Sequence, residues 1–377
     1  MNNLKGGGFL LSKELEDLPF IELKSILEVY GVYKLNRYSN YVISNEVDVK
    51  TIKDTVKRGG YINEGHLIVY DLNRQNNFST DFNTFCREIT NIDRDFFQSI
   101  IYTINSINND IKNNKNNNKS NNKNNNLSFA VRTVKIDDDI PLSTMEIERK
   151  IGHIIKSITK YPVNLKNPNI AIKIIILKEK IIMSILIEKR DREYFQKNRP
   201  HLRTYFHPGC ILPKLGRCMV NLGHLKENDM LYDPFCGTGG FLIEGGFIGC
   251  RLIGSDISEE MVKGTLLNLK SYNLLDKVIS VKKWDANKFK DYLNSLNIDK
   301  VDAIITDPPY GISTSAKGNI INILEHLNEG IKKNGYFVFA SPSKVILKNE
   351  NMYLEGIYSI YVHKSLTRYI HIYKIIN

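Results

Sequence analysis

The segment Asp307-Pro308-Pro309-Tyr310 contains the residue types needed to methylate an exocyclic amino group on a nucleic-acid base. The lone pair of such a nitrogen is delocalised into the ring, so the nitrogen is a poor nucleophile until acceptors hold its hydrogens. The Asp307 carboxylate can be one acceptor and the Pro308 carbonyl the other, because proline fixes φ and removes a competing N–H. Tyr310 offers a ring face for an unstacked base. A simple strand-ending turn is the alternative, because Asp-Pro and Pro-Pro pairs mark turns.

A glycine-rich loop lies upstream, between a predicted strand and a predicted helix. Residues 231–240 read Leu-Tyr-Asp-Pro-Phe-Cys-Gly-Thr-Gly-Gly, and a helix is predicted from Phe241 through Phe247. Glycines let the backbone approach a ligand closely, and a helix start presents N–H groups without intrahelical partners. Asp233 precedes the glycines, and the spacing lacks the G-x-G-x-x-G of a pyrophosphate site. A methyl donor without phosphate, S-adenosylmethionine, therefore fits better than a dinucleotide, although the loop alone would suit either.

Acidic residues end the predicted strands that follow. Asp256 stands about twenty residues beyond the loop, the usual place for an acid that binds ribose. Asp285, followed by Ala286, comes after the next strand and can accept a hydrogen bond from an adenine amino group. Because the carboxyl ends of parallel strands meet at one edge of an open sheet, we expect the loop and these acids to surround one ligand. Either acid alone would also be explained as a solvated strand end.

Alternating strands and helices are predicted to position these residues. The predicted strands lie near residues 230–233, 252–256, 278–281 and 303–306, and the predicted helices at residues 241–247, 258–271 and 287–296. A helix at residues 320–332, a strand at 336–340 and a hairpin formed by 357–362 and 369–375 complete the C-terminal half. The pattern predicts an α/β fold with a mostly parallel sheet, right-handed crossovers and a terminal antiparallel hairpin.

The C-terminal half resembles class I, Rossmann-like, S-adenosylmethionine-dependent methyltransferases that modify amino groups. Upstream, residues 129–132, 146–152 and 163–169 resemble a THUMP domain, a module of RNA-modifying enzymes. The combination is similar to the archaeal tRNA guanine-N2 methyltransferases that act at position 10 of tRNA, across most of the chain except residues 105–126. Related THUMP enzymes that act elsewhere commonly carry Asn in place of Asp307, which favours the position-10 group.

The resemblance assigns expected roles to individual residues. It implies catalysis by Asp307, Pro308 and Tyr310, without a metal. It implies that the donor, S-adenosylmethionine, contacts Asp233, Pro234, Phe235, Gly237, Thr238, Gly239, Asp256, Ile257, Asp285 and Ala286. Basic side chains are candidate contacts for RNA phosphates, although each would also be explained as a solvated surface charge. These candidates are Arg132, Arg149, Lys150, Lys160 and Arg203.

The composition changes along the chain and predicts five consecutive segments. Residues 1–104 are expected to form an α+β region, ferredoxin-like by the resemblance, in which an amphipathic helix is interrupted at Pro19. Residues 105–126 are rich in Asn and Lys and are expected to be a disordered insertion. A THUMP-like RNA-binding domain at 127–188, a basic linker at 189–206 and the methyltransferase domain at 207–377 follow.

The bulk composition fits a protein that binds a polyanion. The chain has 377 residues and a formal net charge of +11, and an excess of positive charge attracts nucleic acid. A compositional bias towards Lys, Asn and Ile would explain the charge equally well. The cysteines are odd in number, without C-x-x-C pairs, and the histidines lack metal-ligand spacing. With no leader-like segment at its start, the chain is expected to be cytoplasmic, without a membrane anchor.

Together these features predict an enzyme that methylates the N2 amine of a guanosine in tRNA, once or twice, with no obligate protein partner. A DNA or rRNA amino-methyltransferase is one alternative, because Asp-Pro-Pro-Tyr also serves enzymes that methylate adenine N6. A non-catalytic tRNA-binding protein with a relict methyltransferase fold is another. The THUMP-like segment argues against DNA, and the complete set of loop and acids argues against a relict.

Overall fold

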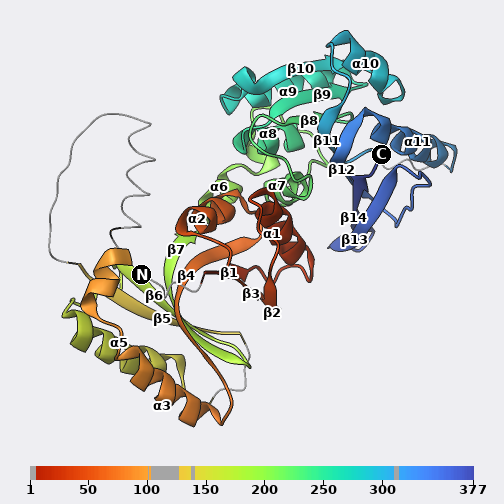
Figure 1. Ribbon diagram of the computed structural model, residues 1–377. Helices are drawn as coiled ribbons and strands as arrows, with labels where there is room; N and C mark the ends of the chain where they lie inside the picture. Colours follow the sequence, from red (N-terminus) through yellow and green to blue (C-terminus); the bar gives the residue numbers. More distant parts are fainter. Residues whose placement is uncertain (1–5, 101, 103–126, 137–140, 310–313) are drawn as a thin grey trace. The chain divides into compact units, whose positions relative to one another are not determined.

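A computed structural model describes residues 6–100, 102, 127–136, 141–309 and 314–377. The chain forms two compact units that are interleaved along the sequence (Figure 1). Unit 1 comprises Met1–Ser12, Val32–Lys57 and Ile62–Arg190, and unit 2 comprises Lys13–Gly31, Arg58–Tyr61 and Asp191–Asn377. The predicted insertion at 105–126 lies outside the described residues. Among the helices that are described, none is long and apolar enough to cross a membrane.

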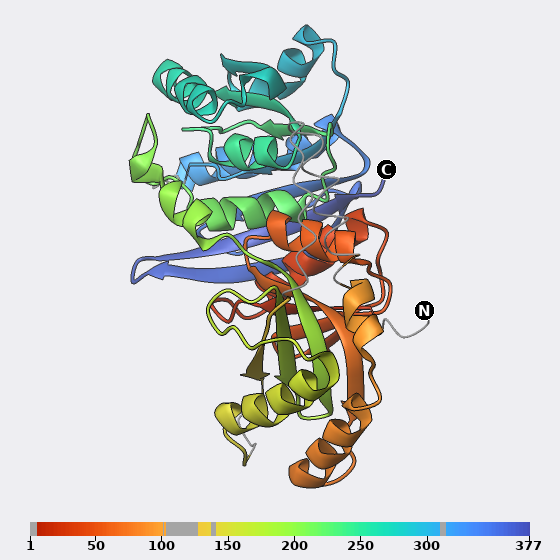
Figure 2. The same ribbon diagram turned by 90° about the vertical axis from the view of Figure 1, so that its left-hand side faces the viewer.

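Unit 1 is built on a seven-stranded sheet with the order β2-β3-β1-β4-β7-β6-β5. Its strands are β1 (Gly7–Leu11), β2 (Asn36–Tyr38), β3 (Tyr41–Ser44), β4 (Ile62–Asn73), β5 (Phe129–Lys135), β6 (Ile170–Ile176) and β7 (Lys180–Lys189). β5 and β6 are parallel, and the other neighbours are antiparallel. The helices include α2 (Val49–Arg58), α3 (Phe78–Ile89) and α5 (Thr144–Thr159), of which α3 and α5 lie side by side (Figures 1 and 2), and residues 94–100 are also helical.

The sequence of α5 determines where the helix begins and which face it buries. Ser143 accepts a hydrogen bond from the Glu146 N–H at 3.2 Å, and the Glu146 carboxylate accepts one from the Ser143 N–H at 2.8 Å. This reciprocal capping box satisfies two donors that the first turn leaves without partners. Ile147, Ile151 and Ile155 recur every four residues and are buried, so the basic side chains between them are left on the outer faces.

Unit 2 is built on a second seven-stranded sheet with the order β10-β9-β8-β11-β12-β14-β13. Its strands are β8 (Met230–Asp233), β9 (Arg251–Asp256), β10 (Val278–Lys283), β11 (Val301–Thr306), β12 (Ile331–Ser341), β13 (Met352–His363) and β14 (Leu366–Ile375). The first five strands in this order are parallel, and β14 is antiparallel to both of its neighbours. The expected mostly parallel sheet with a terminal antiparallel hairpin is therefore confirmed.

Helices flank this sheet, and two apolar cores form against it. The helices of unit 2 are α1 (Leu18–Val29), α6 (Arg192–Lys197), α7 (Pro213–Leu222), α8 (Gly240–Phe247), α9 (Glu259–Ser271), α10 (Phe289–Ser295) and α11 (Thr314–Leu327). The strand order reverses between β8 and β11, and such a switch point is where open α/β sheets bind ligands, beyond the carboxyl ends of the strands.

Helix α1 corrects one sequence prediction and belongs to unit 2 although it comes early in the chain. Pro19 does not interrupt a longer helix; it occupies the first turn, where its missing N–H has no partner to lose. Glu22 of α1 is fully buried, and its carboxylate accepts hydrogen bonds from the N–H groups of Gly60 and Tyr61, each at 2.7 Å, and from Asn221 Nδ2 at 2.8 Å. Early segments of the chain therefore complete the polar interior of unit 2.

Candidate active site

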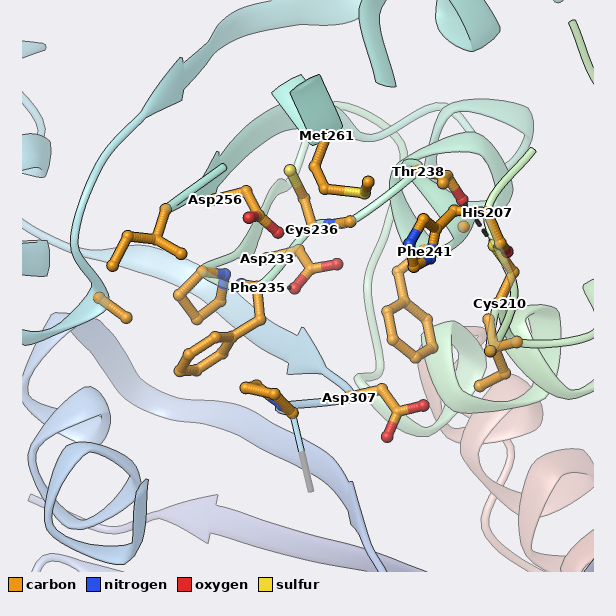
Figure 3. Close-up of a pocket in the computed structure, with 18 of the residues that line it drawn as sticks. His207, Cys210, Asp233, Phe235, Cys236, Thr238, Phe241, Asp256, Met261 and Asp307 are labelled. Atoms are coloured by element: carbon orange, nitrogen blue, oxygen red, sulfur yellow. Dashed lines mark hydrogen bonds between the residues drawn. The ribbon is translucent and has the colours of Figure 1, made fainter. Parts of the chain in front are cut away.

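A cavity of about 520 Å³ opens beyond the carboxyl ends of β8, β9, β10 and β11. Asp233, Asp256, Asp285 and Asp307 all line it, together with most of the loop between β8 and α8. Figure 3 shows three of these acids, Asp233, Asp256 and Asp307, around one space with the rings of Phe235 and Phe241. A volume of this size suits a cofactor-sized ligand.

Two left-handed glycines shape the loop between β8 and α8. Gly237 has φ 51° and Gly239 has φ 83°, a region where residues with a side chain are strained. Asp256 at the end of β9 fixes this loop, because its Oδ2 accepts from the Gly237 N–H at 2.9 Å and its Oδ1 from the Ser258 N–H at 2.9 Å. Helix α8 begins after Gly239 without a side-chain cap, so its first N–H groups are available near the cavity.

Asp233 lies at the back of the cavity and is 1% exposed. Its Oδ1 accepts hydrogen bonds from Thr306 Oγ1 at 2.7 Å and from the Phe235 N–H at 3.1 Å. Burial raises the pKa of Asp233 to about 8, the two hydrogen bonds oppose that rise, and the charges of Asp256 and Asp307 add to it. Asp233 therefore gains or loses a proton near neutral pH, unlike an exposed aspartate.

Replacement of Asp233 by asparagine should change how stability depends on pH. Between the ordinary pKa of 3.8 and the folded value of about 8, the folded protein holds this proton and the unfolded chain does not. The free energy of unfolding of the wild type should therefore fall as pH rises through this window, relative to Asp233→Asn, and level off above it. Urea unfolding of both proteins at about pH 5 and about pH 9 checks this. Parallel pH profiles would contradict the raised pKa.

The residues after β9 and β10 form the wall on one side of the cavity. Ile257 lines it and is 71% exposed, so an apolar surface is open to a flat ligand. Asp285 is half-buried, and its Oδ1 accepts from the backbone N–H and the Nδ2 of Asn287, each at 2.9 Å. Ala286 is buried beside it, and Trp284 contributes an aromatic ring to the same wall.

Asp307 follows β11 and forms an ion pair that the sequence did not reveal. Its Oδ2 lies 3.0 Å from Nη2 of Arg368 on β14, and the two side chains are only 17% and 11% exposed. Pro308 is buried, and Pro309 is exposed and lines the cavity. Tyr310 lies outside the described residues, so its predicted stacking role stays a prediction. An arginine in a terminal hairpin has no local signal that would have linked it to Asp307.

The charges of the cavity distinguish between classes of ligand. Four aspartates line it, and its described lining includes no lysine or arginine. Arg368 balances Asp307, and Asp233 holds a proton below its pKa of about 8, but the carboxylates of Asp256 and Asp285 would still repel pyrophosphate and attract a positively charged ligand. Aromatic and apolar side chains complete the wall: Phe235, Phe241, Trp284, Ile257 and Met261. The residues therefore fit a cation that also carries a flat ring system, as S-adenosylmethionine does.

Comparison with known proteins identifies the family. The family described as an RMKL-like methyltransferase domain matches residues 200–368, and the THUMP domain family matches residues 104–186. The tRNA (guanine(10)-N2)-dimethyltransferase of Methanocaldococcus jannaschii is 49% identical over 371 residues, which are 97% of this chain and 99% of that protein. The chain belongs to the archaeal tRNA (guanine(10)-N2)-dimethyltransferase family.

Other relatives and a solved structure agree with this membership. The protein of the same name from Methanothermobacter thermautotrophicus is 39% identical over 254 residues, covering 65% of this chain and 72% of that protein. The crystal structure of TrmN from Thermus thermophilus has a TM-score of 0.51 at 14% identity and covers 98% of this chain and 99% of that one. This structural similarity supports the fold alone.

In this member of the dimethyltransferase family, four of the basic candidates for RNA contact lie in unit 1. Arg149 and Lys160 are exposed on and just beyond α5. Lys150 is also exposed, but its Nζ binds Asn83 Oδ1 at 2.7 Å and lies over the ring of Phe82. Arg132 is half-buried, with Nη2 donating to the Leu165 carbonyl at 3.0 Å. Arg149 and Lys160 are therefore the most accessible of these candidates.

Arg203, the remaining candidate for RNA contact, is buried. It is 7% exposed in unit 2, where its positive charge acts on Glu244 and Tyr272. RNA contact by Arg203 stays a prediction, and its burial makes it less accessible than Arg149 and Lys160, because folding places this part of the basic linker against α8 and α9.

Proposed function

We propose that this chain methylates the exocyclic N2 amine of the guanosine at position 10 of tRNA, in two successive transfers from S-adenosylmethionine. Membership of the dimethyltransferase family is the basis for naming this substrate. The observation that supports the chemistry is Asp307, which follows β11 directly, lines the acidic cavity and is paired with Arg368. Unit 1, with its THUMP match, would hold the tRNA at a distance from the reacting base, because contacts with the RNA backbone set register rather than chemistry.

The chain's own residues would hold the donor along the carboxyl edge of the sheet. Asp256 would accept hydrogen bonds from the ribose hydroxyls, and Asp285 from the adenine amino group, with Ile257 against the ring. The loop around Gly237 and Gly239 would pass close to the amino-acid portion of the donor. When bound, S-adenosylmethionine supplies an electrophilic methyl group on a positively charged sulfur, which suits a cavity lined by aspartates.

The target guanosine would leave its stack and present N2 to Asp307. In the first transfer, the Asp307 carboxylate and the Pro308 carbonyl would each accept one N2 hydrogen, which turns the nitrogen lone pair towards the methyl group. In the second transfer a single N2 hydrogen remains, and one of these two acceptors would hold it. Orientation of this kind lowers the activation barrier, because the entropy of reaching a reactive geometry is lost on binding rather than in the reaction step. Asp307 would also receive the released proton, directly or through water.

Loss of the Asp256 side chain should weaken donor binding. Unpaired ribose hydroxyls cost about 1–3 kcal/mol, which corresponds to roughly 5-fold to 150-fold in affinity. Because Asp256 also holds the N–H groups of Gly237 and Ser258, Asp256→Ala should have a larger effect than Asp256→Asn, which keeps one acceptor. Calorimetry with S-adenosylmethionine measures both variants. Unchanged affinity in Asp256→Ala would exclude the role in donor binding.

Mass spectrometry of nucleosides tests the proposed function. Unmodified tRNA transcript incubated with the enzyme and donor should yield N2-methylguanosine first and N2,N2-dimethylguanosine later. A matched transcript with adenosine at position 10 should yield neither. Methyl transfer to ribosomal RNA or duplex DNA in preference to tRNA would favour those alternatives instead. Absence of donor binding by calorimetry would favour a non-catalytic RNA-binding protein.

A further inference from the structure

The Asp307–Arg368 ion pair joins two segments that are far apart in sequence and meet at one edge of the sheet of unit 2. Thr306, the last residue of β11, is paired with Phe339 of β12, and Ser341 of β12 is paired with Tyr369 of β14. The register therefore brings the beginning of β14 to the carboxyl end of β11. Arg368, next to Tyr369, reaches Asp307 at 3.0 Å from there.

This contact has the properties of a preorganised pair. Both side chains are mostly buried, and a hydrogen bond between a guanidinium and a carboxylate is stronger and more directional than one between neutral groups. An ionised carboxylate has acceptor sites for about four hydrogen bonds, so a bond from Arg368 to Oδ2 leaves acceptor capacity for an amine. The arginine therefore fixes the orientation and charge of Asp307 without occupying the whole group.

We propose that Arg368 is a positioning residue for methyl transfer, which acts by holding the Asp307 carboxylate ionised and in one orientation before the guanosine arrives. This inference rests on the proposed function of Asp307 and adds a residue to it from the terminal hairpin. Arg368 itself has no contact with the donor or the base in this proposal. Its effect should therefore be confined to the rate of the chemical step, since a mobile Asp307 must be reoriented in each reaction.

Three variants of the full-length enzyme test the proposal. Arg368→Met removes the charge, and Arg368→Lys keeps a charge without the planar fork of the guanidinium. Lys374→Met is the control, because it also removes a positive charge from β14. The Nζ of Lys374 lies 5.8 Å from the ring centre of Tyr336. Each variant is measured for donor affinity, tRNA affinity, unfolding midpoint, and single-turnover methylation at saturating donor and tRNA.

Arg368→Met should slow single-turnover transfer by on the order of 100-fold, the effect of losing a preorganised polar group, while both affinities stay within about threefold of wild type. Arg368→Lys should recover part of the rate, and Lys374→Met should match the wild type. A rate for Arg368→Met equal to that of Lys374→Met would overturn the proposal. A loss of donor affinity or folding as large as the loss of rate would also overturn it, since Arg368 would then be only structural.

A double-mutant cycle shows whether Arg368 acts through Asp307. In an Asp307→Asn background, the added change Arg368→Met should cost less than about threefold in rate, because the carboxylate that Arg368 holds is already absent. An undiminished cost would mean that Arg368 acts on another group and would overturn the proposal. If Asp307→Ala itself retained normal activity, the proposed function of Asp307 would fail, and that outcome is distinct from a failure of Arg368 alone.

Discussion

Asp307→Ala should nearly abolish methyl transfer while donor affinity stays close to that of the wild type. Asp307 lies after β11, whereas the expected donor contacts follow β8, β9 and β10. Loss of one acceptor for the N2 hydrogens removes a preorganised group that acts on the reacting atom, which should raise the barrier by on the order of 3 kcal/mol or more. This corresponds to a rate at least about 100-fold lower. Single-turnover methylation of tRNA and calorimetry with S-adenosylmethionine give the two quantities.

Asp307→Asn is the matched control for this prediction. The alanine variant leaves the partly buried Arg368 without this partner, and an unpaired buried charge can destabilise a protein on its own. Asparagine keeps one acceptor oxygen and nearly the same shape, so it should retain more activity than alanine. Circular dichroism and thermal unfolding establish whether both variants are folded. Near-normal turnover by a folded Asp307→Ala would refute the assignment of Asp307.

A fragment of residues 189–377 should fail to form a stable donor-binding domain, although every predicted donor contact lies within it. The fragment lacks α1 and the segment Arg58–Tyr61, which belong to the same compact unit. Leu18 and Tyr61 are part of the apolar core of that unit, and Glu22 accepts the hydrogen bond of the buried Asn221. Their removal exposes apolar surface and leaves buried polar groups without partners, at about 1–3 kcal/mol for each such group.

The fragment should therefore show no cooperative thermal transition and no measurable donor binding under conditions where the full-length chain shows both. Glu22→Ala in the full-length chain isolates the polar part of this effect and should lower the free energy of unfolding by on the order of 3 kcal/mol. Lys24→Ala is a control on the same helix, since the Lys24 side chain is 49% exposed. A fragment that unfolds at the temperature of the full-length protein would show that the early segments are dispensable.

The sequence alone was sufficient for the sheet of unit 2 and for much of the candidate site. Regular alternation of strands and helices predicts parallel strands, whose carboxyl ends meet at one edge by geometry. Asp233, Asp256, Asp285 and Asp307 each end or follow one of these strands, and the structure brings them to one cavity. The start of α5 was equally predictable, because a capping box is formed by residues three positions apart.

Other features depended on contacts between residues that are distant in sequence. Arg368 meets Asp307 only because β14 inserts beside β12, and Arg203 is enclosed only because its segment packs against α8 and α9 of the same unit. The pKa of Asp233 depends on its burial and on two other carboxylates. The sequence of helix α1 was recognisable as amphipathic, but it did not show that the helix belongs to unit 2. An amphipathic pattern shows that one face is buried without showing what covers that face. Local spacing thus determined the acids and the elements that carry them, while long-range packing decided their partners and their charge.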